Sequence, residues 1–281
     1  MATLALDCPM ATITALNIYP VKSCRGVALT RATLEPTGFT HDRQWLIVRP
    51  NGQFITQREE ARLAAIETAV ADGLLTLRAP NVAALTVPLD VNAGSMEVQI
   101  WKDTCAAFDA GEAAARWLEA FLDKPYRLVR FDPSRTRVSD PKWTGAVPAS
   151  AQFSDGFPYL VIAQASLDDL NRRLPRPLPM NRFRPNIVVD GLPAYGEDDV
   201  FEFAADAARL RVVKPCLRCI ITTTDQERAE RDGDEPLKTL RAYRFNKEMR
   251  GVMFGQNVIL VEGAGRELRV GQELGVQLSA T

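Results

Sequence analysis

The chain has 281 residues, of which 46% are hydrophobic and 25% are charged, and its formal net charge at pH 7 is −1. This length allows two modest domains or one large one, and the near-neutral charge excludes a global attraction to nucleic acid or to anionic membranes. The single histidine, His41, leaves little material for a multi-histidine metal site or a Ser/His/Asp triad. Any basic site must therefore be local.

The cysteines are few and scattered, at Cys8, Cys24, Cys105, Cys216 and Cys219. An odd, dispersed set argues against a disulfide framework and for a reducing compartment. The sequence has no apolar stretch of membrane-helix length, and residues 1–10 lack the positive region of a secretory signal. We expect a cytoplasmic protein that does not associate with membranes.

The first half predicts short strands separated by Gly, Pro, Asn and Asp. These strands are expected at residues 11–19, 27–35, 44–49, 74–77, 96–100 and 126–131. A helix is expected at residues 112–122, because apolar residues recur there at helical spacing and Pro125 lies just beyond its end.

A polar, proline-rich segment at residues 132–154 predicts a long loop. A domain boundary near its start gives expected domains at residues 11–132 and 133–281. Beyond the loop, helices are expected at residues 166–174, with Ser166 as the N-cap, and at 236–245, with Pro236 in the first turn. Further strands are expected at residues 159–162, 186–190, 200–203, 210–213, 257–261, 267–270 and 274–278.

Strands dominate this pattern, and the few helices do not alternate regularly with them. A Rossmann sheet is therefore disfavoured, and no Gly-x-Gly-x-x-Gly or Walker A pattern is present. The expected fold class is α+β, mostly β, with a barrel-like arrangement.

The Cys216-Leu217-Arg218-Cys219 segment is the most informative in the chain. In an extended chain, residues three apart point to opposite faces, so only one cysteine should enter a pocket. We favour Cys219, because the adjacent Arg218 would stabilise its thiolate, and a soft thiolate suits a soft metal centre. A zinc ribbon lacks its second ligand pair, and a thioredoxin-type pair lacks a following helix. Two buried structural cysteines remain the alternative.

A second candidate segment is rich in arginine. If residues 182–186 are extended, Arg182, Arg184 and Asn186 project from one face. Two guanidinium groups and an amide on one face suit a phosphate or an oxygen-rich heterocycle. Surface arginines in ordinary ion pairs are the alternative.

Three shorter segments complete the candidates. Lys22 and Ser23, in a turn after a strand, can offer a charge and a hydroxyl to an anion. Arg43 can face an anion or pair with the preceding aspartate. Asp155 can accept from an amine or act near a substrate, and Gly156 lets the backbone approach a ligand closely. A solvated hairpin loop and a tight turn are the structural alternatives.

Several of these segments occur together and in one order in a known family. They are Tyr-Pro-Val-Lys-Ser-Cys (19–24), Asp-Arg-Gln-Trp (42–45), Ser-Asp-Gly-Phe-Pro (154–158), Asn-Arg-Phe-Arg-Pro-Asn-Ile (181–187) and Cys-Leu-Arg-Cys (216–219). In this combination the chain resembles the MOSC family, the domains related to the C-terminus of molybdenum cofactor sulfurase. It is most similar to the amidoxime-reducing type, which includes the mitochondrial amidoxime reducing component and bacterial counterparts.

The resemblance implies an N-terminal MOSC-type β-barrel domain, a MOSC β-barrel core with a few helices, and a molybdenum–pyranopterin cofactor. It implies that Cys219 ligates molybdenum and that Asp155 handles substrate or protons. Some relatives carry small hydroxyl residues in place of Gly156 and Phe157. The cofactor-binding residues it implies are Lys22, Ser23, Arg43, Gly156, Arg182, Arg184, Asn186 and Arg218.

The implied activity is two-electron removal of oxygen from small N-hydroxylated substrates, namely amidoximes, hydroxylamines and N-hydroxylated bases. The implied partner is a separate electron donor, either a flavin reductase or a ferredoxin-like protein. Neither pyridoxal phosphate nor an intrinsic iron–sulfur cluster is expected. A cofactor carrier, or a sulfur carrier with a persulfide on Cys219, is the alternative.

Overall fold

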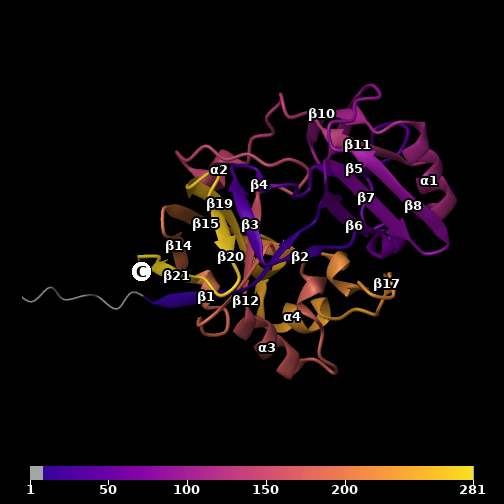
Figure 1. Cartoon of the computed structure of the whole chain (residues 1–281). Helices are drawn as coiled ribbons and strands as arrows, with labels where there is room; N and C mark the ends of the chain where they lie inside the picture. The colour runs from indigo at the N-terminus through magenta and orange to yellow at the C-terminus, as the bar shows by residue number, and fades with distance from the viewer. Residues whose placement is uncertain (1–8, 281) are drawn as a thin grey trace, which may run out of the picture.

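The computed structural model describes residues 9–280, so Cys8 and most of the N-terminal segment discussed above lie outside the described residues. The expected class is confirmed, because strands dominate and the helices are few (Figure 1). The α-helices of this part are α1 (Glu112–Leu122), α2 (Pro141–Thr144), α3 (Gln164–Arg173) and α4 (Leu237–Tyr243). Among residues 9–280, no helix is both long and apolar enough to cross a bilayer.

The largest sheet closes into a barrel of seven strands. Its order is β12 (Tyr159–Ala163), β13 (Ile187–Asp190), β1 (Met10–Ile18), β21 (Glu273–Leu278), β14 (Val200–Ala205), β15 (Ala208–Arg218) and β19 (Gly251–Glu262). Pairing of β12 with β19 completes the circle, and β12–β13 is the parallel pair among antiparallel neighbours. Two short strands extend the sheet, β2 (Val27–Leu29) beside β1 and β18 (Phe245–Asn246) beside β19. Closure removes the unpaired edges that an open sheet would expose.

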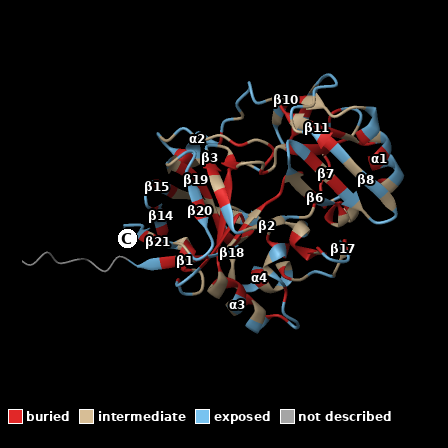
Figure 2. Cartoon of the chain, viewed as in Figure 1, coloured by how far each residue is buried: buried red, intermediate tan, exposed pale blue. Residues whose placement is uncertain are grey.

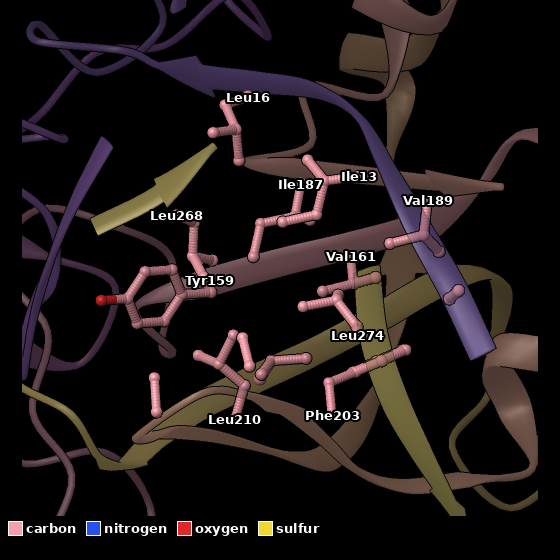
Figure 3. Packing of buried hydrophobic residues seen from close by; sticks show 14 of the residues in the cluster. Ile13, Leu16, Tyr159, Val161, Ile187, Val189, Phe203, Leu210, Leu268 and Leu274 are labelled. Carbon is pink, nitrogen blue, oxygen red and sulfur yellow. The ribbon is translucent and has the colours of Figure 1, made fainter. Parts of the chain in front are cut away.

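The barrel interior is filled by apolar side chains and is not a channel. Ile13 and Leu16 of β1 are fully buried against Val161, Ile187 and their neighbours (Figure 3). Alternate residues of each strand point inward, which explains the alternating burial along β1. The barrel is therefore a rigid support, and ligands must bind outside it.

A second region, drawn in indigo to magenta in Figure 1, lies beside the barrel. It contains a sheet of β5 (Trp45–Val48), β11 (Arg127–Phe131), β10 (Asp103–Asp109) and β9 (Ser95–Ile100), and a second sheet of β6 (Glu67–Ala71), β7 (Leu74–Ala79) and β8 (Val82–Pro88). Helix α1 has the bounds that its periodicity predicts, and it buries Trp117 and Leu118 in the core of this region. Buried residues lie in the interior of both regions (Figure 2).

The remaining elements are short. A small sheet contains β20 (Glu267–Arg269), β3 (Arg31–Glu35) and β4 (Gly38–Phe39), and a ribbon contains β16 (Thr224–Asp225) and β17 (Glu230–Arg231). The 3₁₀ turns are η1 (Ala61–Ala65), η2 (Met180–Arg182), η3 (Gly196–Asp198) and η4 (Ile220–Thr223).

The barrel sheet includes strands from before and after residue 132. Strands β1 and β2 pair within the barrel, so the chain begins there, leaves to build the second region and returns through the loop before β12. Both crossings lie beside the cavity described below.

One helix start was wrong. Helix α3 begins at Gln164 with Ala163 as N-cap, and Ser166 lies inside it. The Ser166 hydroxyl is buried, donates to Glu197 Oε2 at 2.7 Å and accepts from the Tyr195 amide at 2.7 Å. A tertiary contact, not capping, explains this serine.

Candidate functional site

A cavity of about 120 Å³ lies where the two regions meet. Its walls come from the turn after β1, the segment after β5, the loop before β12 and the end of β15. All of the predicted site residues except Arg182 line it: Lys22, Ser23, Arg43, Asp155, Gly156, Arg184, Asn186, Arg218 and Cys219. The structure thus brings together residues from five separate segments of the sequence.

Both cysteines of the Cys-x-x-Cys segment line this cavity, so the expectation that only one enters was wrong. The register of β15 against β19 shifts between Pro215 and Leu217, and the strand ends at Arg218, so simple alternation does not hold there. Cys219 then stands as the N-cap of η4. Both thiols are free and partly buried.

An arginine donates to each sulfur, but the pairing differs from the expected one. Arg218 Nη1 donates to Cys216 Sγ at 2.9 Å, and Arg58 Nη2 donates to Cys219 Sγ at 3.1 Å. The guanidinium that donates to Cys219 Sγ therefore comes from the second region of the molecule and not from the adjacent residue.

Arg182 is the predicted site residue that the structure places elsewhere. Residues 180–182 form the turn η2, and Arg184 has a φ of 56°, so the segment is not extended and its arginines do not share a face. The buried Arg182 guanidinium pairs with Asp232 at 2.6 Å and with Asp225 at 3.2 Å. The prediction of a one-face arrangement was wrong because the backbone turns between these two arginines.

Arg43 and Arg184 lie over the ring of Tyr19, at 4.4 and 4.2 Å from its centroid. Arg43 also donates to Asp42 at 2.5 Å and to Asn186 Oδ1 at 2.8 Å. Burial lowers the pKa of Arg184 to about 10, which leaves it charged at neutral pH. Asn186 is fixed by the protein, since its amide also donates to Asn17 O at 3.1 Å.

Lys22 and Asp155 form an ion pair across the cavity at 2.5 Å. Trp101 Nε1 donates to the same Asp155 oxygen at 3.2 Å. Burial lowers the pKa of Lys22 to about 8, although the Asp155 charge opposes this. Burial alone would raise the pKa of Asp155, but the charges of Lys22 and Arg58 and two hydrogen bonds hold it well below its usual range.

The cavity wall carries more positive than negative charge. Asp155 is the one carboxylate among the described residues that line it, and the lining cations are Lys22, Arg43, Arg58, Arg184 and Arg218. Two buried donors on this wall, Ser154 Oγ and Arg218 Nε, have no hydrogen-bond partner within residues 9–280. Unpaired buried donors and excess cations together suit an anionic, oxygen-rich ligand.

The protein alone does not build a conventional metal cage in this part of the chain, since no group of three His, Cys, Asp or Glu residues is placed to hold an ion within residues 9–280. The donor set of the cavity instead consists of soft sulfur and cationic nitrogen. Such a set fits an anionic cofactor that brings its own ligands for a soft metal and takes one thiolate from the protein.

Sequence reasoning missed three contributors to this site. Arg58 and Trp101 come from the second region, in stretches where no local pattern signals a contact with the barrel. Arg137 lies in the long loop, where its guanidinium donates to the carbonyls of Gln152, Ser154 and Asp155. Arg137 thereby fixes the backbone that carries Asp155.

The simpler assignments hold. Cys24 and Trp45 are buried core residues, as expected for packing roles. His41 is a loop residue within hydrogen-bond distance of Gln44. The loop at residues 132–154 is irregular apart from α2.

The fold and the cavity define a mostly β protein with a closed barrel and a thiol-bearing anion site at its side. Residues 10–125 match the MOSC N-terminal beta barrel domain, and residues 148–275 match the MOSC domain. The chain belongs to the MOSC-domain family, in its amidoxime-reducing branch.

Two named relatives of 34% identity support this membership. The chain is 34% identical over 256 residues to mitochondrial amidoxime-reducing component 1 of Mus musculus, covering 88% of this chain and 75% of the relative. It is 34% identical over 245 residues to mitochondrial amidoxime reducing component 2 of Homo sapiens, covering 84% and 73%. A crystal structure of the YUAD protein from Bacillus subtilis aligns over 96% of this chain and 97% of that one, with a TM-score of 0.41 and 13% identity.

Proposed function

We propose that this protein is a molybdenum-cofactor-dependent reductase of N-hydroxylated compounds. The names of its relatives support amidoxime reduction, and the family supports a molybdenum cofactor. The observation that carries the proposal is the cavity itself, in which two thiols and five cations face one carboxylate. The cations and thiols of this wall fit an anionic cofactor with a thiolate-ligated metal.

The residues of the cavity divide into two roles. Cys219 would hold the metal, and Arg58 Nη2 lies 3.1 Å from its sulfur. Ser23, Arg184 and Arg218 would hold the anionic part through charge-assisted hydrogen bonds. When bound, the molybdenum cofactor would supply the two-electron redox chemistry of the reaction.

Proton handling falls to the pair of Lys22 and Asp155. Reduction of an amidoxime to an amidine and water consumes two electrons and two protons. Asp155 stays ionised at neutral pH, because Lys22 and Arg58 hold its pKa low, so it accepts hydrogen bonds and does not donate a proton. Lys22, with a pKa of about 8, is the group on this wall best matched to donate one near neutral pH.

The electrons must be resupplied from outside the cavity, because each turnover consumes two of them. We expect a separate donor protein, a flavin reductase or a ferredoxin-like protein. The names of the relatives place them in mitochondria, so a cytoplasmic location for this chain stays a prediction.

The test is to express the protein in a molybdenum-replete host, measure bound molybdenum and assay amidoxime reduction with an artificial electron donor. We expect bound molybdenum and turnover, and a loss of activity of about 100-fold or more in Cys219→Ala. The neighbouring thiol provides the matched variant, and Cys216→Ala should lose less than about tenfold.

Other outcomes point to other functions. Bound molybdenum without turnover would favour a cofactor carrier, and sulfane sulfur without molybdenum would favour a sulfur carrier. Full activity in metal-loaded Cys219→Ala would contradict the assignment of the ligand.

A further inference from the structure

The tip of the β9–β10 hairpin carries an unusual residue. Ile100 pairs with Asp103, so Trp101 and Lys102 form a two-residue loop. Trp101 has a φ of 54°, in the left-handed region that such loops normally fill with Gly or Asn. A bulky residue held in that region is a backbone outlier of the kind that gathers at ligand sites.

The indole of Trp101 contacts two residues of the cavity wall, Arg58 and Asp155. The Arg58 guanidinium lies 4.5 Å from the ring centroid, and the Phe54 ring meets the indole edge-on at 5.0 Å. Its Nε1 donates to Asp155 Oδ1 at 3.2 Å, and 43% of the residue is still exposed. The hairpin thus places an open aromatic surface beside a residue of the cavity wall.

Arg58 connects this surface to the thiol. The same guanidinium that lies over Trp101 donates to Cys219 Sγ at 3.1 Å. Trp101, Arg58 and Cys219 therefore form a row of contacting side chains from the exposed indole to the candidate metal ligand. A planar group resting on the indole would be directed along this row.

Asp155 offers a free acceptor next to the indole. Its Oδ1 accepts from Lys22 and Trp101, whereas Oδ2 accepts no hydrogen bond from residues 9–280 and has only the 3.9 Å ion pair with Arg58. The side chain is 62% exposed, so Oδ2 is accessible to a ligand. An N–H group of a ligand can satisfy it.

We propose that Trp101 determines substrate specificity, by providing with Arg58 a platform on which a planar, conjugated N-hydroxylated substrate stacks. An N–H group next to the N–O bond donates to Asp155 Oδ2 and orients that bond toward Cys219. The inference rests on the proposed function and narrows its substrates to aromatic amidoximes and N-hydroxylated heterocycles. An aliphatic amidoxime keeps the hydrogen bond but loses the stacking.

Two variants separate stacking from the indole hydrogen bond. Trp101→Phe and Trp101→Leu both remove the Nε1 donor, but only the first keeps an aromatic surface. With molybdenum-loaded enzyme and an artificial donor, we compare kcat/KM for benzamidoxime with kcat/KM for acetamidoxime. The ratio should stay within about threefold of the wild-type ratio in Trp101→Phe and fall about tenfold in Trp101→Leu, mainly through KM. Equal kcat/KM ratios in the two variants would overturn the proposal that Trp101 is a stacking platform.

A second measurement needs no turnover. Benzamidoxime added to ¹⁵N-labelled protein should shift the indole N–H signal of Trp101, which is identified by its absence in Trp101→Phe, and acetamidoxime should shift it less. Equal or absent shifts would overturn the inference. Wild-type protein that binds molybdenum and reduces neither amidoxime, but shows the selective indole shift, would contradict the proposed function and retain the platform.

The hairpin supplies a control for backbone strain. Trp101→Gly fits the positive φ but removes the aromatic surface, so it should lower the substrate ratio as Trp101→Leu does. Asn81→Gly relieves a similar φ of 62° at the exposed tip of the β7–β8 hairpin and should leave the substrate ratio unchanged.

Discussion

Two arginine-rich sites of this protein differ in how their charges are balanced. In the first, Arg182 is almost fully buried and pairs with Asp225 and Asp232, and Arg176 also binds Asp232. In the second, the cavity wall, five cations face a single lining carboxylate. The positive charge around Arg182 is neutralised by carboxylates of the protein itself. The excess positive charge of the cavity wall is left for a ligand to neutralise.

Only Phe183 separates Arg182 of the first site from Arg184 of the second in the sequence. Phe183 ends the turn η2 with a φ of −92°, and Arg184 follows with a φ of 56°. This change of backbone direction sends Arg182 into the acidic cluster and Arg184 into the cavity. An arginine-rich motif therefore does not identify an anion site by itself, and the balance of nearby charge does.

The largest effect on stability is expected from removing Arg182. Arg182→Leu leaves Asp225 and Asp232 without their main buried cation, and breaking a buried pair in this way costs about 3 kcal/mol or more. The free energy of unfolding should fall by that amount in urea denaturation. Arg176→Leu removes a partner that is 59% exposed and should cost less than about 1 kcal/mol.

The matched substitution in the cavity, Arg184→Leu, should weaken ligand binding without lowering the free energy of unfolding. Arg184→Leu removes a partly buried charge that has no carboxylate partner within the described residues, so stability should hold or rise. Binding of pyrophosphate, measured by calorimetry on cofactor-free protein, should weaken about tenfold or more. Equal destabilisation by Arg182→Leu and Arg184→Leu would remove the distinction between the sites.

The sequence predicts well what depends on local pattern. The helix at residues 112–122 appears with the same bounds, because Trp117 and Leu118 follow its periodicity and Pro125 lies just beyond it. Strands β6, β8 and β10 were missed, because they are rich in Ala and Thr and β8 is largely exposed, so no apolar alternation marks them.

The site residues show the same limit. Cys219, Lys22 and Arg184 belong to motifs that identify the family, so they could be named in advance. Arg58 and Trp101 enter the site through the packing of the second region against the barrel, which no local signal encodes. Arg182 was misplaced because two residues of turn geometry decide which way its side chain points.

The charge of the cavity should also depend on pH. Burial lowers the pKa of Lys22 to about 8, so the wall loses one positive charge as the pH rises through this value. Pyrophosphate binding to cofactor-free protein should therefore weaken several-fold between pH 7 and pH 9.5. Lys22→Arg stays charged throughout, and its binding should vary much less over this range.

As the pH rises, the free energy of unfolding should increase, whereas pyrophosphate binding weakens. Between about pH 8 and pH 10.5 the unfolded Lys22 binds more protons than the folded one, so its titration raises the free energy of unfolding with pH. The unfavourable contribution is fully present below pH 8 and is relieved above it. A Lys22→Arg protein with the same pH dependence of both binding and unfolding as the wild type would show that Lys22 does not titrate in this window.

The smallest effect is expected where the cavity wall is open even around the backbone. A Cβ built on Gly156 meets no heavy atom within 4 Å, and the residue has no positive φ, so Gly156→Ala should change the free energy of unfolding by no more than about 0.5 kcal/mol.

The barrel provides the contrasting position, since a Cβ on Gly255 would lie 2.6 Å from Ile162 Cγ1 and its φ is 77°. Gly255→Ala should cost about 2 kcal/mol or more, because both the backbone and the packing oppose it. Thermal and urea denaturation of the two variants measure the difference directly. A large loss of stability in Gly156→Ala would mean that the loop is packed as tightly as the barrel, and the view of this wall as open space reserved for a ligand would then be wrong.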